Sequence, residues 1–151
     1  MPPFLLRCGR FEIDLTHPRI MGIVNLTDDS LSGDGLGADT ARAIAHGRRL
    51  VEEGADMLDI GGESSRPGAL PISQEQELAR VLPVLEGLRD CGVPLSIDTL
   101  KPAVMQAALA AGADMINDIT ALQNPGALEA VAASQCAVCL MHMQGNPRTM
   151  Q

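Results

Sequence analysis

A short sequence unit occurs twice in this chain, and it restricts the possible folds more than any other feature. Residues 54–60 read Gly-Ala-Asp-Met-Leu-Asp-Ile, and residues 112–119 read Gly-Ala-Asp-Met-Ile-Asn-Asp-Ile. In each copy a glycine suited to ending a helix is followed by a short turn and an apolar run that carries polar residues towards its end. Nearly continuous apolar runs are typical of parallel strands buried on both faces. The unit therefore predicts the end of a helix followed by a strand of a parallel sheet.

Three further apolar runs, at residues 20–25, 91–98 and 136–141, end in polar residues in the same way. Helical signals lie between the runs. Ser73, with Gln76 three residues later, has the pattern of a capping box, and Pro102 suits a first helical turn, where its missing N–H costs nothing. Asp39 is interpreted as an N-cap. The predicted helices cover residues 39–53, 73–90, 102–111 and 126–133.

Residues 4–14 add a predicted β-hairpin, so the chain reads as a hairpin followed by βαβαβαβαβ. Such a pattern fits a TIM barrel or a doubly wound sheet. We favour the barrel because a polar residue ends every predicted strand, and because no GxGxxG pattern follows the first strand. A complete (β/α)₈ barrel needs about 250 residues. We therefore expect one α/β domain over residues 1–151, a TIM barrel truncated to about its first five β/α units. The polar strand ends are Asn25, Asp59, Asp98, Asn117 and His142.

Composition narrows the classes of partner. The net charge is −8, which argues against a nucleic acid or an anionic membrane surface as partner. The 46% hydrophobic content supports a core, and with two Phe, no Trp and no Tyr this core must be aliphatic. Four cysteines do not form a disulfide framework in a chain of this size, and Cys136 and Cys139 lie within one predicted strand rather than in a metal or redox motif. Without a signal peptide or membrane span in the sequence, we expect a cytoplasmic location.

The loop after the second predicted parallel strand carries the densest set of functional groups. Residues 59–68 read Asp-Ile-Gly-Gly-Glu-Ser-Ser-Arg-Pro-Gly. Glycines allow the backbone to approach a ligand closely, and the fork of donors on Arg66 suits phosphate oxygens. The alternative is a surface loop in which Arg66 pairs with Glu63. Because polar loops recur at the other strand ends, we predict a functional loop.

Five segments together resemble the dihydropteroate synthase family, in order and spacing, across essentially the whole chain. They are residues 21–32, 59–68, 96–99 (Ser-Ile-Asp-Thr), 116–119 (Ile-Asn-Asp-Ile) and 139–147 (Cys-Leu-Met-His-Met-Gln-Gly-Asn-Pro). The resemblance implies a TIM barrel of which this chain covers the N-terminal part. It also implies an enzyme that joins p-aminobenzoate to the methylene carbon of 6-hydroxymethyl-7,8-dihydropterin pyrophosphate. The products are 7,8-dihydropteroate and pyrophosphate, and Mg²⁺ assists.

The resemblance assigns substrate-binding roles that make chemical sense for these residue types. Asp98 and Asn117 would hold the pterin edge-on, because a carboxylate and an amide complement its ring donors and acceptors. Their strands would be neighbours in the barrel, so both side chains can face one pocket. Met141 would supply adaptable apolar surface against the ring.

The other roles implied by the resemblance concern pyrophosphate, the metal and the second substrate. Asn25 would contact Mg²⁺, a hard ion that needs few protein oxygens when it also binds substrate phosphates. Ser65, in place of the family's usual Thr, and Arg66 would meet p-aminobenzoate and the departing pyrophosphate, with Arg66 as the catalytic cation. Pro67 would shape the p-aminobenzoate pocket. We also expect the complete form of the protein to be a homodimer.

The sequence departs from the family pattern in two ways. Asp28 and Leu31 replace a proline and a phenylalanine of the first loop, so we expect a looser p-aminobenzoate pocket and weaker inhibition by sulfonamides. The family's later pterin-binding and anion-binding segments would lie beyond Gln151. On these grounds we expect the 151-residue chain alone to be poorly stable and not a competent synthase.

Each assigned residue also has a purely structural interpretation. Asn25 and Asn117 could cap the helices that follow, Asp98 could hydrogen-bond its own loop, and His142 could be packed at a strand end. Two other functions stay open beside the synthase. One is a non-catalytic fragment that needs a partner chain, and the other is a pterin-binding barrel of the corrinoid methyltransferase type.

Overall fold

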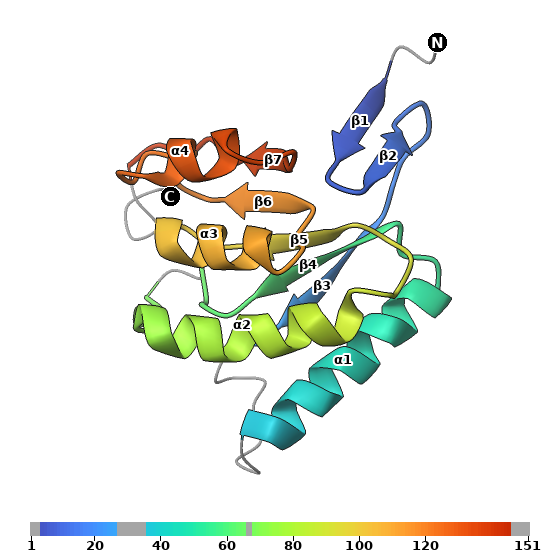
Figure 1. The fold of residues 1–151 in the computed structure, drawn as a ribbon, viewed down its shortest axis with the longest axis horizontal. Coiled ribbons are helices and arrows are strands. Elements are labelled where there is room, and N and C mark those ends of the chain that lie inside the picture. The colour runs from blue at the N-terminus through green and yellow to red at the C-terminus, as the bar shows by residue number, and fades with distance from the viewer. Residues whose placement is uncertain (1–3, 27–35, 66–67, 146–151) are drawn as a thin grey trace.

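The computed structural model describes residues 4–26, 36–65 and 68–145, which form two sheets and four helices (Figure 1). β1 (Leu5–Cys8) and β2 (Phe11–Asp14) pair as an antiparallel hairpin. A second sheet contains five strands, all parallel and hydrogen-bonded in chain order. The predicted hairpin and the five predicted parallel strands are thus confirmed. The strands are β3 (Met21–Asn25), β4 (Met57–Gly61), β5 (Leu95–Asp98), β6 (Met115–Asp118) and β7 (Ala137–Leu140).

Four helices connect these strands and lie side by side along one face of the sheet (Figure 1). They are α1 (Leu36–Glu52), α2 (Gln74–Leu88), α3 (Pro102–Ala110) and α4 (Ala127–Ala132). The predicted capping box at the start of α2 is present: Ser73 Oγ accepts from the Gln76 N–H at 3.1 Å, and Gln76 Oε1 accepts from the Ser73 N–H at 3.0 Å.

The N-cap interpretation of Asp39 was wrong, because α1 begins three residues earlier, at Leu36. Asp39 lies in the first turn instead, where a carboxylate is favourable to the helix dipole. Its Oδ1 is 2.9 Å from Nη2 of Arg42, three residues later on the same helix surface. A local interaction along the helix therefore replaces the expected cap.

The sheet buries apolar side chains on both faces, in two separate clusters. The larger cluster lies between the sheet and the helices. The smaller one lies on the opposite face, where the hairpin packs against residues near the starts of the strands. Burial on both faces explains why the parallel strands have nearly continuous apolar sequences. The larger cluster includes Val24, Leu58, Ile60, Leu95, Ile97, Ile116, Leu85 and Leu88, and the smaller consists of Cys8, Ile13, Met57, Met115 and Ala137.

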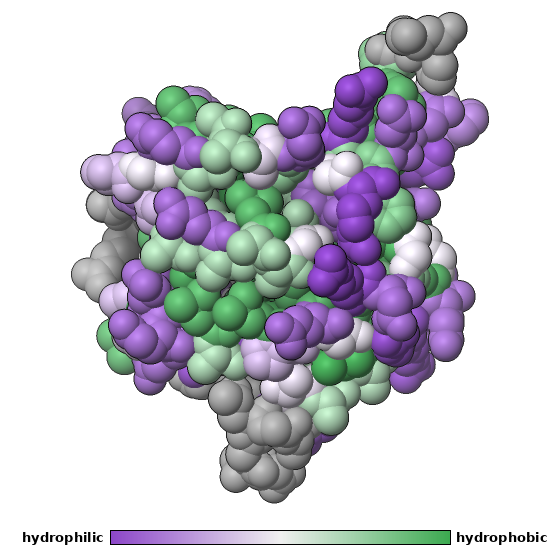
Figure 2. Space-filling model, viewed as in Figure 1, coloured by the Kyte–Doolittle hydropathy of each residue, from purple (hydrophilic) through white to green (hydrophobic). Residues whose placement is uncertain are grey.

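Hydrophobic and hydrophilic residues are unevenly distributed on the surface formed by the helices. Hydrophobic residues gather over α3 and along its border with α2, with hydrophilic residues around them (Figure 2). The sequence of α3, Pro-Ala-Val-Met-Gln-Ala-Ala-Leu-Ala, contains no charged residue. Within the described ranges, no helix is both long and apolar enough to cross a bilayer.

The aspartate of the repeated sequence unit has the same role in both copies. Asp56, just before β4, donates its backbone N–H to the carbonyl of Ile20 and accepts the Ile20 N–H with its carboxylate, both at 2.8 Å. Asp114, just before β6, makes the same pair of bonds with Leu95, at 2.8 and 3.0 Å. Each aspartate thus bonds both backbone groups of a residue at the start of the neighbouring strand. The repeated unit therefore helps to fix the register of a strand pair.

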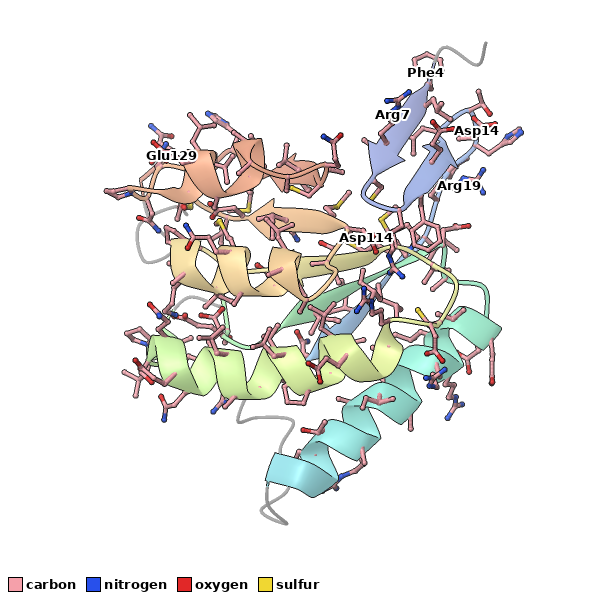
Figure 3. The ribbon with its side chains drawn as sticks, in the orientation of Figure 1. Phe4, Arg7, Asp14, Arg19, Asp114 and Glu129 are labelled. Atoms are coloured by element: carbon pink, nitrogen blue, oxygen red, sulfur yellow. The ribbon has the colours of Figure 1, made fainter. Side chains whose placement is uncertain are left out.

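Asp114 also attaches the hairpin to the sheet (Figure 3). Its carboxylate is 1% exposed and accepts from the backbone N–H, Nε and Nη2 of Arg10, at 3.0–3.1 Å. The preceding Gly9 has a φ of +56°, and a Cβ there would lie 2.5 Å from Asp114 Oδ1. Glycine is thus required at this turn by both the backbone conformation and the close approach. Cys8 packs beside this joint, and burial, followed by the charge of Asp114, raises its thiol pKa to about 11.

The two outer strands are less buried than the inner ones. β4 is buried along its whole length, but Ile23 of β3 is 48% exposed, and Val138 and Leu140 of β7 are 44% and 49% exposed. Within the described residues, β3 pairs only with β4, and β7 only with β6. Apolar side chains next to unpaired backbone groups at a sheet edge favour association with other strands.

We expect Asp114→Asn to lower the free energy of unfolding by about 3 kcal/mol, because it leaves Arg10 without its buried anion and weakens the bond to the Leu95 N–H. Asp56→Asn is the matched control from the same repeat position. Its carboxylate is 31% exposed and its ion pair with Arg19 is 3.4 Å long, so we expect a loss of at most about 1 kcal/mol. Urea denaturation measures both values, and equal losses would contradict a special role for Asp114.

The 151-residue chain should self-associate through its sheet edges. We expect Val138→Lys and Ile23→Lys each to reduce the association seen in sedimentation velocity, because an edge lysine opposes strand pairing. Leu128→Lys, at a 61% exposed position on a helix rather than on an edge strand, should leave it unchanged. A monomeric wild-type chain with a cooperative melt would refute this expectation.

Candidate active site at the carboxyl edge of the sheet

The strand register places polar residues in one row across the carboxyl edge of the sheet. Asn25 pairs with Gly61, Gly61 with Asp98, Asp98 with Asn117, and Asn117 with Cys139. Residues in register share a face, and this face is opposite the one covered by the helices. The predicted neighbours Asp98 and Asn117 are therefore adjacent, as expected. Gly61 has no side chain, and the Asp98 side chain lies beside it, with Oδ2 3.6 Å from the position that a Cβ would take.

Asp59 lies on the same face of the sheet, in a lower row two residues before Gly61, and its side chain binds that of Asn117. Its side chain is buried, with the residue 4% exposed, and its Oδ2 accepts from Asn117 Nδ2 at 3.1 Å. An ionised carboxylate only accepts hydrogen bonds, so the contact fixes which end of the amide is the NH₂ and directs the amide oxygen elsewhere. Asp59 was predicted only as a polar strand end and not as a site residue. Its position could have identified it as a site residue, because it lies two residues before Gly61 and therefore on the same face of the strand.

Two buried oxygens of this lower row have no hydrogen-bond partner among the described residues. They are Asp59 Oδ1 and the hydroxyl of Ser96, and the two residues are paired in register. Buried polar atoms without partners are costly, so they occur mainly where a ligand, water or functional requirement explains them. The row beneath Asp98 and Asn117 thus has unused hydrogen-bonding capacity.

Asp98 lies in an environment that disfavours its ionised form. Burial is the main cause and nearby carboxylates the second, and together they raise its pKa from 3.8 to about 7. Clustered acids with perturbed pKa values are characteristic of functional sites. The contributing carboxylates, in order of effect, are those of Asp59, Glu77, Asp118 and Glu63.

The loop after β4 is held by charged residues from two other elements. Lys101, in the connection from β5 to α3, donates from Nζ to Glu63 Oε2 and, at 2.8 Å, to Glu77 Oε2 of α2. The alternative that Glu63 serves only to pair with Arg66 is therefore incomplete, because Glu63 binds Lys101. Ser65 is exposed at the end of the described part of this loop. Arg66 and Pro67, predicted to meet the second substrate, lie outside the described residues, as do Asp28 and Leu31 of the first loop.

Two predicted residues follow β7 at the same edge of the sheet. Met141 is 36% exposed, and its backbone N–H donates to the carbonyl of Asp118 at 3.2 Å, which keeps it beside the end of β6. His142 is exposed, so the interpretation as a packed strand-end histidine was wrong. The Asp118 carboxylate accepts from Thr120 and Leu122, and thereby holds a loop in which Ala121 and Leu122 have left-handed backbone conformations.

Asn25 fits the predicted magnesium contact in position and chemistry. It ends β3 in the polar row, is exposed, and borders a small cavity of about 170 Å³ that Asp39 and His46 also line. In the described part of the chain, no group of three or more His, Cys, Asp or Glu residues could hold a metal by itself. A Mg²⁺ ion at Asn25 would therefore take most of its ligands from water or from the oxygens of a phosphorylated ligand.

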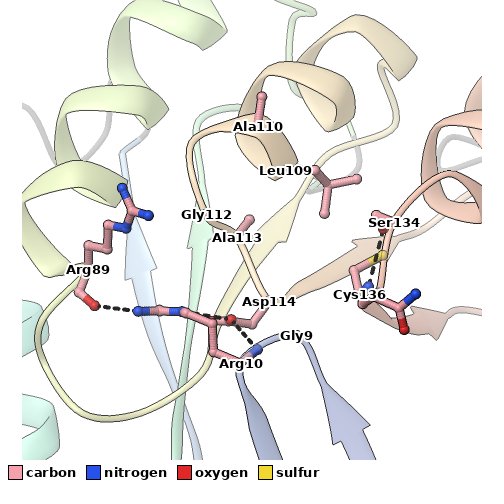
Figure 4. A pocket seen from close by; sticks show the side chains of 11 residues that line it. Gly9, Arg10, Arg89, Leu109, Ala110, Gly112, Ala113, Asp114, Ser134 and Cys136 are labelled. Carbon is pink, nitrogen blue, oxygen red and sulfur yellow. Dashed lines mark hydrogen bonds and ion pairs between the residues drawn. The ribbon is translucent and has the colours of Figure 1, made fainter.

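A larger groove, of about 420 Å³, lies beside the hairpin, at the end of the sheet where the parallel strands begin (Figure 4). Its cations serve the fold. Arg10 binds Asp114 and also donates from Nη1 to the carbonyl of Arg89 at 2.9 Å, next to the carboxyl end of α2. Gly112, just past α3, lies against the Arg89 guanidinium. Cations are favourable at helix carboxyl ends, so we interpret this groove as a structural joint.

Comparison with known proteins supports a pterin-related site. Residues 21–151 match the protein family described as "Pterin binding enzyme". The dihydropteroate synthase of Neisseria meningitidis serogroup B is 53% identical over 148 residues, covering 96% of this chain and 52% of that protein. The chain thus spans about half the length of the curated relatives it matches.

Solved structures agree with the sequence comparison. A Burkholderia cenocepacia dihydropteroate synthase complexed with 7,8-dihydropteroate has a TM-score of 0.85 and 52% identity, covering 99% of this chain and 50% of that one. A Xanthomonas albilineans dihydropteroate synthase with 4-aminobenzoic acid has a TM-score of 0.87 and 56% identity, covering 93% and 52%. These similarities confirm the predicted α/β fold of the TIM-barrel type, of which the described residues form four consecutive β/α units and a fifth strand.

We expect Asp98→Asn to stabilise the protein increasingly as the pH rises from 4 to 8. The folded state raises the pKa of Asp98 from 3.8 to about 7, so ionisation costs stability that is present below pH 4 and lost by about pH 7. The gain at pH 8 should be roughly 2–4 kcal/mol, the free energy of a shift of about three units.

Thermal or urea denaturation at several pH values measures this gain. Asp90→Asn is the control, because Arg48 lowers the pKa of the exposed Asp90 carboxyl and its replacement should have the opposite sign. A gain for Asp98→Asn that does not depend on pH would contradict the expectation.

Proposed function

This chain belongs to the pterin binding enzyme family, and we propose that it forms the pterin-binding part of a dihydropteroate synthase. The observation that carries the proposal is the pairing of Asp98 with Asn117 above the buried Asp59. A carboxylate and an oriented amide, side by side, offer two acceptors at a fixed spacing to the edge of a flat heterocycle. Relatives of this name at about half sequence identity support the same substrate class.

The reaction needs positioning more than acid–base chemistry. The amine nitrogen of p-aminobenzoate forms a bond to the pterin methylene carbon, the bond from that carbon to the pyrophosphate oxygen breaks, and the amine loses a proton. Asp98 and Asn117 would hold the ring, and Met141 would cover part of it. Ser65 and Arg66 would hold the second substrate and the leaving group, so that the reacting atoms are kept close.

Mg²⁺ remains part of the proposal, with Asn25 as its protein contact. When bound, the ion would neutralise negative charge on the leaving pyrophosphate. Asn25 would orient the phosphate end of the substrate relative to the ring pocket, because it lies in the same row as Asp98, separated by Gly61. Sulfonamides, as analogues of p-aminobenzoate, would then compete at the Ser65–Pro67 loop.

Two observations bear on the alternatives. The named relatives are dihydropteroate synthases and not corrinoid methyltransferases, which favours the synthase. The exposed apolar edges of β3 and β7 favour a chain that needs further strands for full activity. We therefore propose that this chain needs a partner or further strands for turnover, and that the complete form is a homodimer.

Calorimetric titration with 6-hydroxymethyl-7,8-dihydropterin pyrophosphate and Mg²⁺, followed by an assay of dihydropteroate formation with p-aminobenzoate, tests the proposal. Binding with turnover supports the synthase, and binding without turnover supports a fragment that needs a partner. Asn117→Ala should weaken binding about tenfold or more, whereas the exposed control Arg49→Ala should not. Failure of the wild-type chain to bind this substrate would reject the proposal.

Arg66→Lys should lower kcat/KM for both substrates at least about tenfold in a form of the protein that shows turnover, with little change in thermal stability. A lysine cannot reproduce the bidentate fork of a guanidinium on phosphate or carboxylate oxygens. Steady-state kinetics and a melting curve on the same preparation separate the two effects. Unchanged kcat/KM would remove Arg66 from the catalytic role.

A further inference from the structure

The base of the loop after β4 lies directly on α2. A Cβ at Gly62 would approach Val81 Cγ2 to 3.0 Å and Glu77 Cγ to 3.2 Å, so only glycine fits without displacement. Arg80 of α2 donates from Nη1 to the carbonyl of Gly62 at 3.1 Å and to that of Leu26 at 3.4 Å. The backbone at the start of the loop is thus held against one helix by close packing and by hydrogen bonds from the Arg80 guanidinium.

The next residue of the loop is held from another direction. Lys101 Nζ contacts Glu63 Oε2 and lies 2.8 Å from Glu77 Oε2. Lys101 and Glu63 side chains are 20% and 18% exposed, and that of Glu77 is 1% exposed, so the three charges are largely shielded from water. A buried carboxylate needs a partner charge, and removing that partner costs more than breaking a surface ion pair. One ammonium group therefore binds two carboxylates that belong to two different elements.

The connection that carries Lys101 is anchored independently of its ammonium group. The Thr99 N–H donates to the carbonyl of Asn117 at 3.1 Å, Asn124 Nδ2 donates to the carbonyl of Leu100 at 2.7 Å, and the Lys101 N–H donates to Thr99 Oγ1 at 3.2 Å. The backbone beyond Asp98 is thus tied to β6 and to the loop before α4. Loss of the Lys101 charge should therefore free the Glu63 loop but leave Asp98 in place.

We propose that Lys101 is a positioning residue that, by binding Glu63 and Glu77 together, fixes the loop of residues 62–65 relative to the Asp98–Asn117 row. Ser65 is two residues beyond Glu63, so the placement of Glu63 determines where the second-substrate segment begins. This role rests on the proposed function for its catalytic consequence but not for the structural anchoring itself. Under this proposal, the two substrates bind to parts of the site that are held in place independently. The pterin ring binds at the strand ends, and p-aminobenzoate binds at the loop of residues 62–65.

The anchoring is tested without any ligand. Hydrogen exchange of the backbone amides of residues 62–65 should become about tenfold faster in Lys101→Met, since a charge-assisted contact is lost. Exchange in β5 and in the hairpin should stay the same. Arg49→Met is the control, because it removes a cation from an exposed pair with Glu53. If Lys101→Met does not fold, Glu63→Gln replaces it, since that variant keeps the shape of the less buried partner.

The catalytic consequence is tested by a difference between substrates. In a form of the protein that shows turnover, KM for p-aminobenzoate should rise about tenfold in Glu63→Gln and Lys101→Met. The Kd of 6-hydroxymethyl-7,8-dihydropterin, which lacks the pyrophosphate, should stay within about twofold. A variant that is merely destabilised would not separate the two values in this way.

The outcomes are distinguishable. Unchanged exchange in residues 62–65 overturns the anchoring, whatever the protein binds. Faster exchange with an unchanged KM for p-aminobenzoate, or with an equal loss of pterin affinity, overturns the positioning role. If the wild type binds neither substrate, the proposed function fails, while the exchange result still decides whether Lys101 anchors the loop.

Discussion

The parallel sheet depends on an aspartate that precedes β4 and again β6. Asp56 and Asp114 each bond both backbone groups of a residue at the start of the adjacent strand, Ile20 and Leu95. Such a contact fixes the pairing at one end of a strand pair, and in a parallel sheet the pairing at one end determines the alignment at the other. At the carboxyl edge this alignment sets Asn25 level with Gly61 and Asp98 level with Asn117, and the pairing of β4 with β5 joins the two pairs into one row. Asp114 also holds Arg10, so the same residue closes the amino end of the sheet with the hairpin.

The two edges of the sheet therefore serve different purposes. At the amino edge, charges are paired, and Arg10 satisfies the buried carboxylate of Asp114 with three donors. At the carboxyl edge, carboxylates outnumber their partners: Asp59 and Ser96 have unused oxygens among the described residues, and Asp98 has a raised pKa of about 7. A stable protein places its unsatisfied polar groups where a ligand can use them. Lys101 binds the neighbouring Glu63 and Glu77, whose charges also contribute to the raised pKa of Asp98.

The sequence predicted the local elements well, because their signals are local. The capping box at Ser73, Pro102 in a first turn and the repeated apolar runs all depend on residues close in the chain. Asp39 was misread as an N-cap because nothing in the sequence distinguishes an N-cap aspartate from one in the first turn. The contact between Asp59 and Asn117 and the pairing of Lys101 with Glu63 and Glu77 join residues 24 to 58 positions apart. They could not be read from spacing, since they arise only when the strands are aligned.

The central claim is that the Asp98 carboxylate binds the edge of a pterin ring. Titration of Asp98 tests this claim most directly. Carbon-13 NMR of the labelled aspartate side chains, with Asp98→Asn for assignment, should give Asp98 a pKa of about 7 in the free protein. Saturation with 6-hydroxymethyl-7,8-dihydropterin should lower that pKa, because ring N–H groups that donate to the carboxylate favour its ionised form. A pKa near 4 in the free protein, or binding of the pterin with no change in the Asp98 titration, would contradict the account.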